Sequence, residues 1–244
     1  IGALSVGSNK KYKSNIGPVP GKVKFCKFND VSHLKKLVNK KTLAIIIEFV
    51  QGDGGINICS KNFAKAIKEI CKNKKILLIG DEIQGGIGRT GKIFAYKHYG
   101  VNPDIITSAK GLGSGIPIGA TIVKKYISKI ISTGFHGSTF GGGMLQTRVS
   151  YNVFRTINNK SFLNKVLING NLLSSLIKKM HLIHKDKIID TRCLGLMAGV
   201  EFKNNQIALK TYEKMSKNGL ISTLIQGNIV CLLYTSDAAD EKYR

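Results

Sequence analysis

The chain has 244 residues, of which 43% are hydrophobic and 21% are charged, as in globular proteins with one large or two modest domains. This composition excludes an intrinsically disordered chain. The 38 lysines and arginines against 14 acidic residues give a net charge of +24, but the lysines are spread along the whole chain and form no basic arm. We attribute most of this charge to a lysine-rich genomic composition, and a polyanionic partner stays an alternative.

The apolar runs and the cysteines indicate the cellular compartment of the protein. The longest apolar runs, such as residues 43–49, are far shorter than the roughly 20 residues of a membrane-spanning helix. The five cysteines are odd in number and include no CxxC pair, which argues against a disulfide framework or a zinc site. The sequence therefore predicts a cytoplasmic protein with neither a membrane segment nor a bound metal.

Both ends of the chain are expected to be cut. The chain begins at Ile1 without an initiator methionine or a signal peptide, and its first residues read like the middle of a folded unit. Residues 231–241 read CLLYTSDAADE, and the codons TGT CTC TTA TAC ACA TCT encode the first six of them. This string resembles the transposon end of sequencing-library adaptors. We expect a fragment in which residues 231–244 form a non-native tail.

Short apolar runs alternate with helical patterns after Thr42, which is typical of βα units around a mainly parallel sheet. The first run is β-branched enough to predict a strand buried on both faces. Ser60 is placed to cap the helix that follows it. The expected strands cover residues 43–49, 75–81 and 103–109, and a further apolar run covers residues 116–123.

Helical periodicity replaces this pattern after Gly143, where the sheet is expected to end. Two helices are followed by a hairpin over residues 188–202 and a helix over residues 207–217. We interpret this part as a smaller, truncated α+β domain. The predicted organisation is a partial large domain over residues 1–155, a linker helix and small domain over residues 156–230, and the tail.

Residues 85–92 hold two common nucleotide-binding patterns. The stretch from Gly86 to Gly91 matches GxGxxG after a strand, but the helix and the ribose-binding acid of a dinucleotide site do not follow it. With Lys92 the stretch approaches a phosphate-binding P-loop, but Ile93 stands where Ser or Thr must hold magnesium. A nucleotide-binding module on this loop stays an alternative, as does a basic nucleic-acid-binding protein.

Two residues of opposite charge stand at neighbouring strand ends. Asp81 ends one predicted strand and Lys110 follows the next, and ligands of open α/β sheets bind where such ends meet. A lysine that forms a Schiff base and a carboxylate that pairs with a pyridinium nitrogen are what pyridoxal phosphate requires. Nearby glycines would let the backbone approach a flat ring closely. On these two residues alone, a surface salt bridge would be the simpler interpretation.

Four longer stretches favour the cofactor site over a surface salt bridge. They read EFVQGDGG (48–55), DEIQGGIGRTGKIFAYKHYGVNPDIITSAKGLGSGIPIGA (81–120), HGSTFGG (136–142) and RCLGLMAGVEF (192–202). In order and spacing they resemble the class III pyridoxal-phosphate aminotransferases, in particular those that act on acetylornithine, over about residues 1–230. The resemblance implies a fold-type I large domain and a homodimer. It also implies transfer of an amino group from acetylornithine, or a related ω-amino donor, to 2-oxoglutarate in arginine biosynthesis.

The resemblance further implies a role for each residue of these motifs. Lys110 would hold the cofactor covalently and carry the proton transfer, and Asp81 would pair with the pyridine nitrogen. The other cofactor contacts would come from Glu82, Ile83 and Gln84, and from Thr139 on the phosphate of the neighbouring subunit. The substrate contacts would come from Ser138, Glu48 and Asp53.

Departures from the family pattern concern the substrate side and missing segments. Asp53 replaces the usual Glu and Phe49 the usual Pro, while GGGM at 141–144 replaces GGNP and leaves the start of the next helix open. An earlier phosphate-binding loop, an aromatic residue that stacks on the ring and an arginine after Val230 are missing. We therefore expect an active parent enzyme and a chain that by itself binds the cofactor poorly. The donor, whether acetylornithine, succinylornithine, ornithine or 4-aminobutyrate, is left open.

Overall fold

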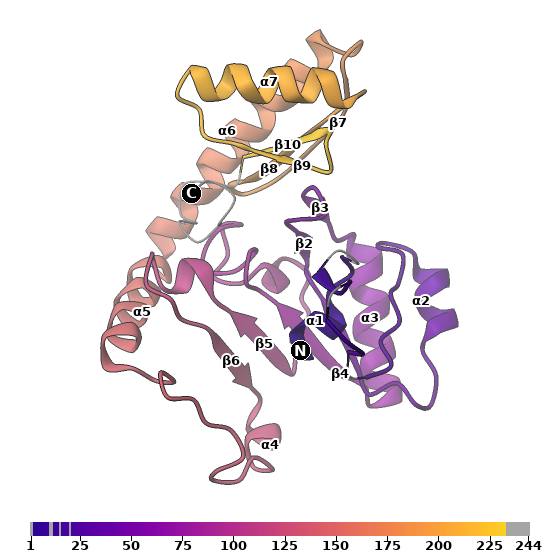
Figure 1. Ribbon diagram of the computed structural model, residues 1–244, viewed down its shortest axis with the longest axis vertical. Helices are drawn as coiled ribbons and strands as arrows, with labels where there is room; N and C mark the ends of the chain where they lie inside the picture. Colours follow the sequence, from indigo (N-terminus) through magenta and orange to yellow (C-terminus); the bar gives the residue numbers. More distant parts are fainter. Residues whose placement is uncertain (1, 10–11, 15, 20, 233–244) are drawn as a thin grey trace. The chain divides into compact units, whose positions relative to one another are not determined.

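The computed structural model describes residues 2–9, 12–14, 16–19 and 21–232 (Figure 1). It divides into two compact units, Ile1–Thr42 and Leu43–Arg244. The first unit contains the helices α1 (Gly2–Val6) and α2 (Val31–Leu37). Asp30 caps α2, because its carboxylate accepts a hydrogen bond from the His33 amide at 2.8 Å. The predicted site residues all belong to the second unit.

The second unit contains a mixed sheet in the order β1-β4-β5-β6. Strands β1 (Ala44–Ile47), β4 (Leu77–Asp81) and β5 (Ile105–Ser108) are parallel and lie in the three segments predicted as strands. Strand β6 (Ala120–Val123) is antiparallel to β5. Residues 109–119 are too few for a crossover between parallel strands, which takes about a dozen residues or more, so β6 returns in the opposite direction.

Helix α3 (Lys61–Lys74) connects β1 to β4 and packs against both strands. Ser60 caps this helix as predicted, since its Oγ accepts a hydrogen bond from the Phe63 amide at 3.1 Å. The prediction that the first strand is buried on both faces is wrong. Strand β1 is at the edge of the sheet, where it has a neighbouring strand on one side only, and its Ile46 is 40% exposed.

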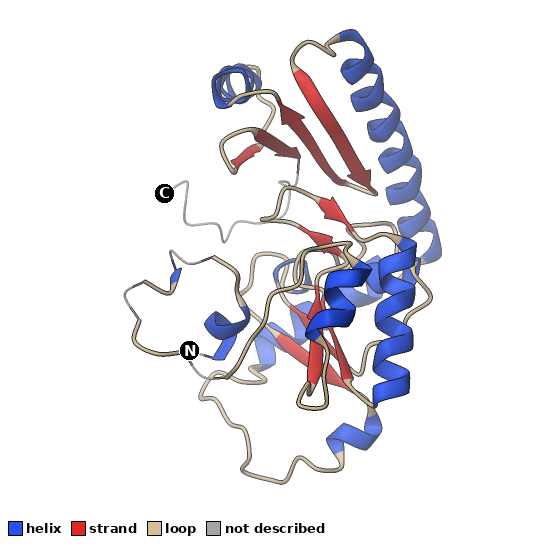
Figure 2. Ribbon diagram, turned by 90° about the vertical axis from the view of Figure 1, so that its right-hand side faces the viewer, coloured by secondary structure: helices blue, strands red, loops and turns tan. Residues whose placement is uncertain are grey.

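The remainder of the second unit contains a second, antiparallel sheet. Helices α5 (Met144–Ile157) and α6 (Lys160–Ile183) precede it, and Figure 2 shows α6 running along this sheet. The predicted hairpin and the helix after it, α7 (Asn205–Lys217), are confirmed. In the sheet order the strands are β7 (Ile188–Leu194), β8 (Met197–Phe202), β10 (Ile229–Leu232) and β9 (Thr223–Ile225). Where the structure describes the chain, no helix has both the length and the apolar character needed to cross a membrane.

Strand β10 includes the first two residues of the expected non-native tail. Cys231 pairs with Gly199 and Leu232 with Ala198, and the Cys231 side chain is fully buried. The strand therefore continues two residues beyond Val230, where we expected it to end. Residues 233–244 lie outside the described residues. The foreign origin of the tail, like the domain boundary near residue 155, stays a prediction.

A small hairpin lies between the two sheets (Figure 1). It consists of β2 (Val50–Gln51) and β3 (Asn57–Ile58). Its residues share a buried cluster with strands β8 and β10, formed by Val50, Ile56, Met197, Ile229 and Cys231. The turn of this hairpin therefore has its position fixed by the antiparallel sheet, although it follows a strand of the mixed sheet.

Candidate active site

Three charged residues lie where the parallel strands end. Glu48 follows β1, Asp81 ends β4 and Lys110 follows β5 after one intervening residue. Because the strands are parallel neighbours, with Ile47 beside Gly80 and Asp81 beside Thr107, their carboxyl ends meet at one edge of the sheet. The structure thus brings together the two residues that the sequence placed at strand ends and adds a second carboxylate.

The Asp81 carboxylate has a fixed orientation. Its Oδ1 accepts a hydrogen bond from the Thr107 hydroxyl at 3.1 Å and another from the Ile83 amide at 3.1 Å. A carboxylate oriented in this way can pair with a protonated ring nitrogen.

Glu48 is a half-buried carboxyl group within this charge cluster. Burial, together with the negative charges of Asp81 and Asp53, raises the pKa of Glu48 to about 7. A hydrogen bond from the Gly52 amide and the positive charge of Lys110 act in the opposite direction. Glu48 therefore changes its protonation state near neutral pH, as groups at functional sites often do.

The backbone around Lys110 is strained. Lys110 begins the short 3₁₀ helix η3 (Lys110–Leu112) with φ of 46°, in the left-handed region that non-glycine residues rarely adopt. Ile87 and Ser114 share this conformation, with φ of 49° and 46°. Such strain clusters at functional sites, where the surrounding structure holds the backbone in place.

Glycine is needed after Lys110 for a different reason from the one predicted. A Cβ atom at Gly113 would lie 1.9 Å from the Ile116 carbonyl oxygen, so only glycine fits the bend of the chain. Gly115 has φ of 99°, another conformation that favours glycine. These two glycines shape the loop that carries Lys110, and close approach to a ligand ring is not needed to explain them.

Gln84 and Asp53 are joined directly. The Gln84 Nε2 donates a hydrogen bond to Asp53 Oδ1 at 3.1 Å. Gly52 makes this possible, because a Cβ atom there would lie 1.8 Å from Gln84 Oε1. A residue expected beside the cofactor and one expected beside the substrate therefore form one hydrogen-bonded pair.

Glu82 has a structural environment that its motif does not reveal. Its side chain is fully buried, and its two carboxylate oxygens accept hydrogen bonds from the Ala95 and Tyr96 amides at 2.7 and 2.9 Å. These amides begin the 3₁₀ helix η2 (Ala95–His98). Burial raises the pKa of Glu82 to about 7, against these two hydrogen bonds. Both oxygens of Glu82 thus hold η2 in place, and a contact of Glu82 with the cofactor stays a prediction.

Ser138 and Thr139 do not join the other predicted site residues within this chain. Both are exposed in the segment between α4 (Lys125–Ser128) and α5. This segment follows β6, which runs against β5 and therefore ends at the opposite edge of the sheet from Lys110 (Figure 1). Their assignment to a neighbouring subunit or to the substrate stays a prediction.

The glycine-rich loop of residues 85–92 packs against helices. A Cβ atom at Gly88 would lie 2.5 Å from the Ile157 side chain of α5, and one at Gly91 would lie 2.3 Å from the Leu167 side chain of α6. A phosphate-binding loop needs its backbone amides open to the ligand. These contacts argue against the nucleotide-binding alternative.

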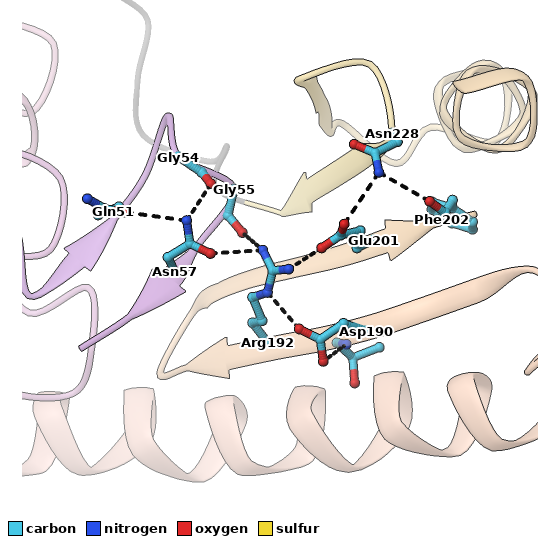
Figure 3. A network of polar contacts seen from close by, with 10 residues as sticks. Gln51, Gly54, Gly55, Asn57, Asp190, Arg192, Glu201, Phe202 and Asn228 are labelled. Carbon is cyan, nitrogen blue, oxygen red and sulfur yellow. Dashed lines mark hydrogen bonds and ion pairs between the residues drawn. The ribbon is translucent and has the colours of Figure 1, made fainter. Parts of the chain in front are cut away.

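Sequence reasoning missed Arg192, a residue of β7 whose environment is shown in Figure 3. Its Nη1 donates hydrogen bonds to the Gly55 carbonyl oxygen at 2.8 Å and to Asn57 Oδ1 at 3.1 Å. The rest of the guanidinium pairs with Asp190 and Glu201. The signals in the sequence are the place of Arg192 at the start of the RCLGLMAGVEF motif and an acid two residues before it, on the same face of a strand.

A comparison with protein-family models matches residues 1–242 of this chain to the family "Aminotransferase class-III". The chain belongs to the class III aminotransferases. Members of this family use pyridoxal phosphate. The match extends through most of the segment expected to be a non-native tail, whose origin stays a prediction.

Known class III aminotransferases resemble this chain over about half of their length. The chain is 42% identical to acetylornithine aminotransferase of Methanocaldococcus jannaschii over 217 residues, which cover 86% of this chain and 53% of the relative. It is 36% identical to ornithine aminotransferase 1 of Staphylococcus saprophyticus over 250 residues, which cover 100% of this chain and 62% of the relative. The chain thus spans little more than half the length of these curated relatives.

Solved structures show the same similarity. The ornithine aminotransferase of Toxoplasma gondii matches 96% of this chain and 56% of its own, with a TM-score of 0.89 and 29% identity. The acetylornithine aminotransferase of Elizabethkingia anophelis matches 84% of this chain and 53% of its own, with a TM-score of 0.78 and 33% identity. The α/β architecture with a mostly parallel sheet and a separate antiparallel sheet is therefore that of the family.

The strand-end residues of this class III chain fit pyridoxal phosphate. Lys110 supplies a primary amine at the edge where the parallel strands end, and Asp81 supplies a carboxylate whose orientation Thr107 and Ile83 fix. No group of three or more potential metal ligands lies together in the described parts of the chain. The chemistry of this donor set is that of an organic ring cofactor held by an amine and a carboxylate.

Proposed function

We propose that the protein to which this chain belongs transfers an amino group from acetylornithine, or a related ω-amino donor, to 2-oxoglutarate in arginine biosynthesis. The observation that carries this proposal is the juxtaposition of Lys110 and the oriented Asp81 at the strand ends of a class III aminotransferase. The names of the relatives support the donor class, since they include acetylornithine and ornithine aminotransferases. The chain spans only part of these relatives, so the activity of the whole protein is part of the proposal.

Each side chain at this edge of the sheet has a separate role. Pyridoxal phosphate, when bound, supplies a ring that accepts electrons from the substrate. The Lys110 amine would hold the cofactor and would act as the general base and acid that moves the proton at the substrate Cα. Asp81 would keep the pyridine nitrogen protonated, and Ile83 and Gln84 would help to hold the ring, as the family resemblance implies.

The second carboxylate of the cluster and its neighbours serve the substrate side. Glu48 and Asp53 face the substrate, and Ser138 contacts it from the exposed segment. Gln84 connects the two sides through its hydrogen bond to Asp53. We propose that this chain by itself is inactive and binds the cofactor poorly, because it spans little more than half the length of its curated relatives.

A homodimer would complete the site, with Thr139 on the cofactor phosphate of the neighbouring subunit. The exposed apolar side chains around Thr139 support this, since Phe135 is 75%, Phe140 85% and Met144 90% exposed. Sedimentation of the full-length protein at assay concentrations should therefore show a dimer and no active monomer. A fully active monomer would contradict the shared site.

The direct test of the proposal is cofactor binding. Addition of pyridoxal phosphate to the full-length protein should produce absorbance near about 415 nm, where protonated lysine adducts of this cofactor absorb. An amino donor should then bleach this band, and 2-oxoglutarate should restore it. A protein that instead binds ATP or nucleic acid, without the absorbance band, would support one of the alternatives and overturn the proposal.

The cytoplasm is the compartment we propose. The proposal rests on the sequence, whose five cysteines are odd in number and include no CxxC pair, which argues against a disulfide framework. One relative, from Debaryomyces hansenii, is described as a mitochondrial acetylornithine aminotransferase. Fractionation of cells that produce the full-length protein distinguishes the two compartments.

A further inference from the structure

Arg192 lies at the junction of the antiparallel sheet and the β2–β3 hairpin (Figure 3). The side chain is only 21% exposed, and it is paired with two carboxylates, Asp190 at 2.7 Å and Glu201. One carboxylate would suffice to neutralise a guanidinium. The second fixes the plane of the group, so that Nη1 is directed at the hairpin.

The Nη1 atom of Arg192 donates hydrogen bonds to the hairpin turn at two points. Arg192 donates to the Gly55 carbonyl oxygen at 2.8 Å and to Asn57 Oδ1 at 3.1 Å. Asn57 connects Arg192 to a second residue of the turn, since its Nδ2 donates a hydrogen bond to the Gly54 carbonyl oxygen at 2.7 Å. The C-terminal half of the turn is therefore fixed to β7 by a planar, charged donor.

The N-terminal half of the turn is held from the mixed sheet. The Gly52 amide donates a hydrogen bond to Glu48, and the Gly55 amide donates to the Gly52 carbonyl oxygen at 3.0 Å. Asp53 lies between these two attachments and accepts the hydrogen bond from Gln84. The position of Asp53 thus depends on Glu48 at one end of the turn and on Arg192 at the other.

Packing leaves the turn little freedom to shift. A Cβ atom at Gly55 would lie 2.4 Å from the Ile229 side chain of β10, and one at Gly199 would lie 3.2 Å from the Gly55 carbonyl oxygen. The backbones of the turn and of β8 therefore approach each other closely. A lysine at position 192 has a single nitrogen and could not serve both carboxylates and both acceptors of the turn at once.

We infer that Arg192 is a positioning residue that couples the antiparallel sheet to the turn carrying Asp53 and thereby sets the substrate side of the site. This inference rests on the proposed function, because that function places Asp53 beside the substrate. Arg192 itself contacts neither substrate nor cofactor in this assignment. Its contribution is to the affinity for the amino donor and leaves the proton transfer at Lys110 unaffected.

Three variants separate positioning from general stability. Arg192→Lys removes the bridge. Asn57→Ala removes one of the two contacts with the turn and keeps both ion pairs and the bond to the Gly55 carbonyl oxygen. Glu201→Gln replaces one ion pair by a neutral hydrogen bond and keeps both contacts to the turn. Arg148→Lys, at an exposed arginine of α5, is the matched control. If Arg192 only stabilised the sheet, Glu201→Gln would resemble Arg192→Lys.

The first measurement is hydrogen exchange of the Gly55 and Ile56 amides in the full-length protein. Exchange should accelerate about 10- to 100-fold in Arg192→Lys, as expected when a hydrogen bond to a charged group is lost, and in the same direction in Asn57→Ala. Glu201→Gln and Arg148→Lys should stay within about threefold of the parent protein. Unchanged exchange in Arg192→Lys, or equal acceleration in Glu201→Gln, would overturn the inference.

The second measurement concerns the substrate side. In Arg192→Lys the KM for the amino donor should rise about tenfold while kcat stays within about twofold, and the cofactor absorbance should be unchanged. An equal loss in kcat would overturn the inference, because it would place Arg192 in the chemical step. A parent protein that binds no pyridoxal phosphate would refute the proposed function, whereas the hydrogen-exchange result would still decide whether Arg192 positions the turn.

Discussion

Replacement of Lys110 by alanine should abolish covalent attachment of the cofactor. Borohydride reduction of the full-length protein with pyridoxal phosphate should fix the cofactor on Lys110 in the parent protein and leave none fixed in the variant. The rate constant kcat should fall by at least about 10²- to 10⁴-fold, the contribution expected of the positioned proton donor alone. The loss follows from the place of Lys110, at the end of β5 beside the oriented carboxylate of Asp81.

Lys92→Ala is the matched control for this experiment. Lys92 is exposed in the glycine-rich loop and is the lysine that a phosphate-binding loop would use. The control should keep both the reduced cofactor on Lys110 and the activity. Cofactor that remains fixed in Lys110→Ala, on any other residue, would refute the assignment of Lys110.

Replacement of Asp81 by asparagine should lower kcat by about 10²- to 10³-fold, the usual cost of removing a preorganised electrostatic partner. The amide keeps the shape of the side chain and an oxygen for the Thr107 and Ile83 hydrogen bonds, but it loses the charge that holds the ring nitrogen protonated. Thr107→Val removes only the orienting hydroxyl and should cost about tenfold or less. An Asp81→Asn protein with parental kcat would show that another group carries this charge.

The same variant has a second expected effect, on Glu48. The charge of Asp81 is one cause of the raised pKa of Glu48, second to burial. Its removal should therefore shift the pKa of Glu48 downward from about 7, and Glu48 should stay ionised to lower pH. The acidic limb of the pH profile for kcat/KM should move in that direction, and a limb that moves upward or stays fixed would contradict the assignment of this titration to Glu48.

The amino-acid sequence determined the strand ends and the family. Asp81 and Lys110 could be placed together because parallel strands end at a common edge, and this holds whatever the details of side-chain packing. The long motifs from 48–55 to 192–202 indicated a class III aminotransferase, which the family match confirms. The direction of β6 and the last two residues of β10 were not predicted, because short segments carry little information on pairing.

Only the tertiary structure decided which acceptors and donors the charged side chains meet. The carboxylate of Glu82 holds amides 13 and 14 residues further along the chain, and Arg192 holds the carbonyl oxygen of Gly55, 137 residues before it. The glycines of residues 85–92 match nucleotide-binding patterns in the sequence, yet in the fold Gly88 and Gly91 accommodate α5 and α6. A local pattern fixes the face on which a side chain lies, because that follows from the period of a strand or helix. Its partner depends on how distant segments pack together. Backbone carbonyls and amides, which every residue other than proline carries, leave no mark in the sequence.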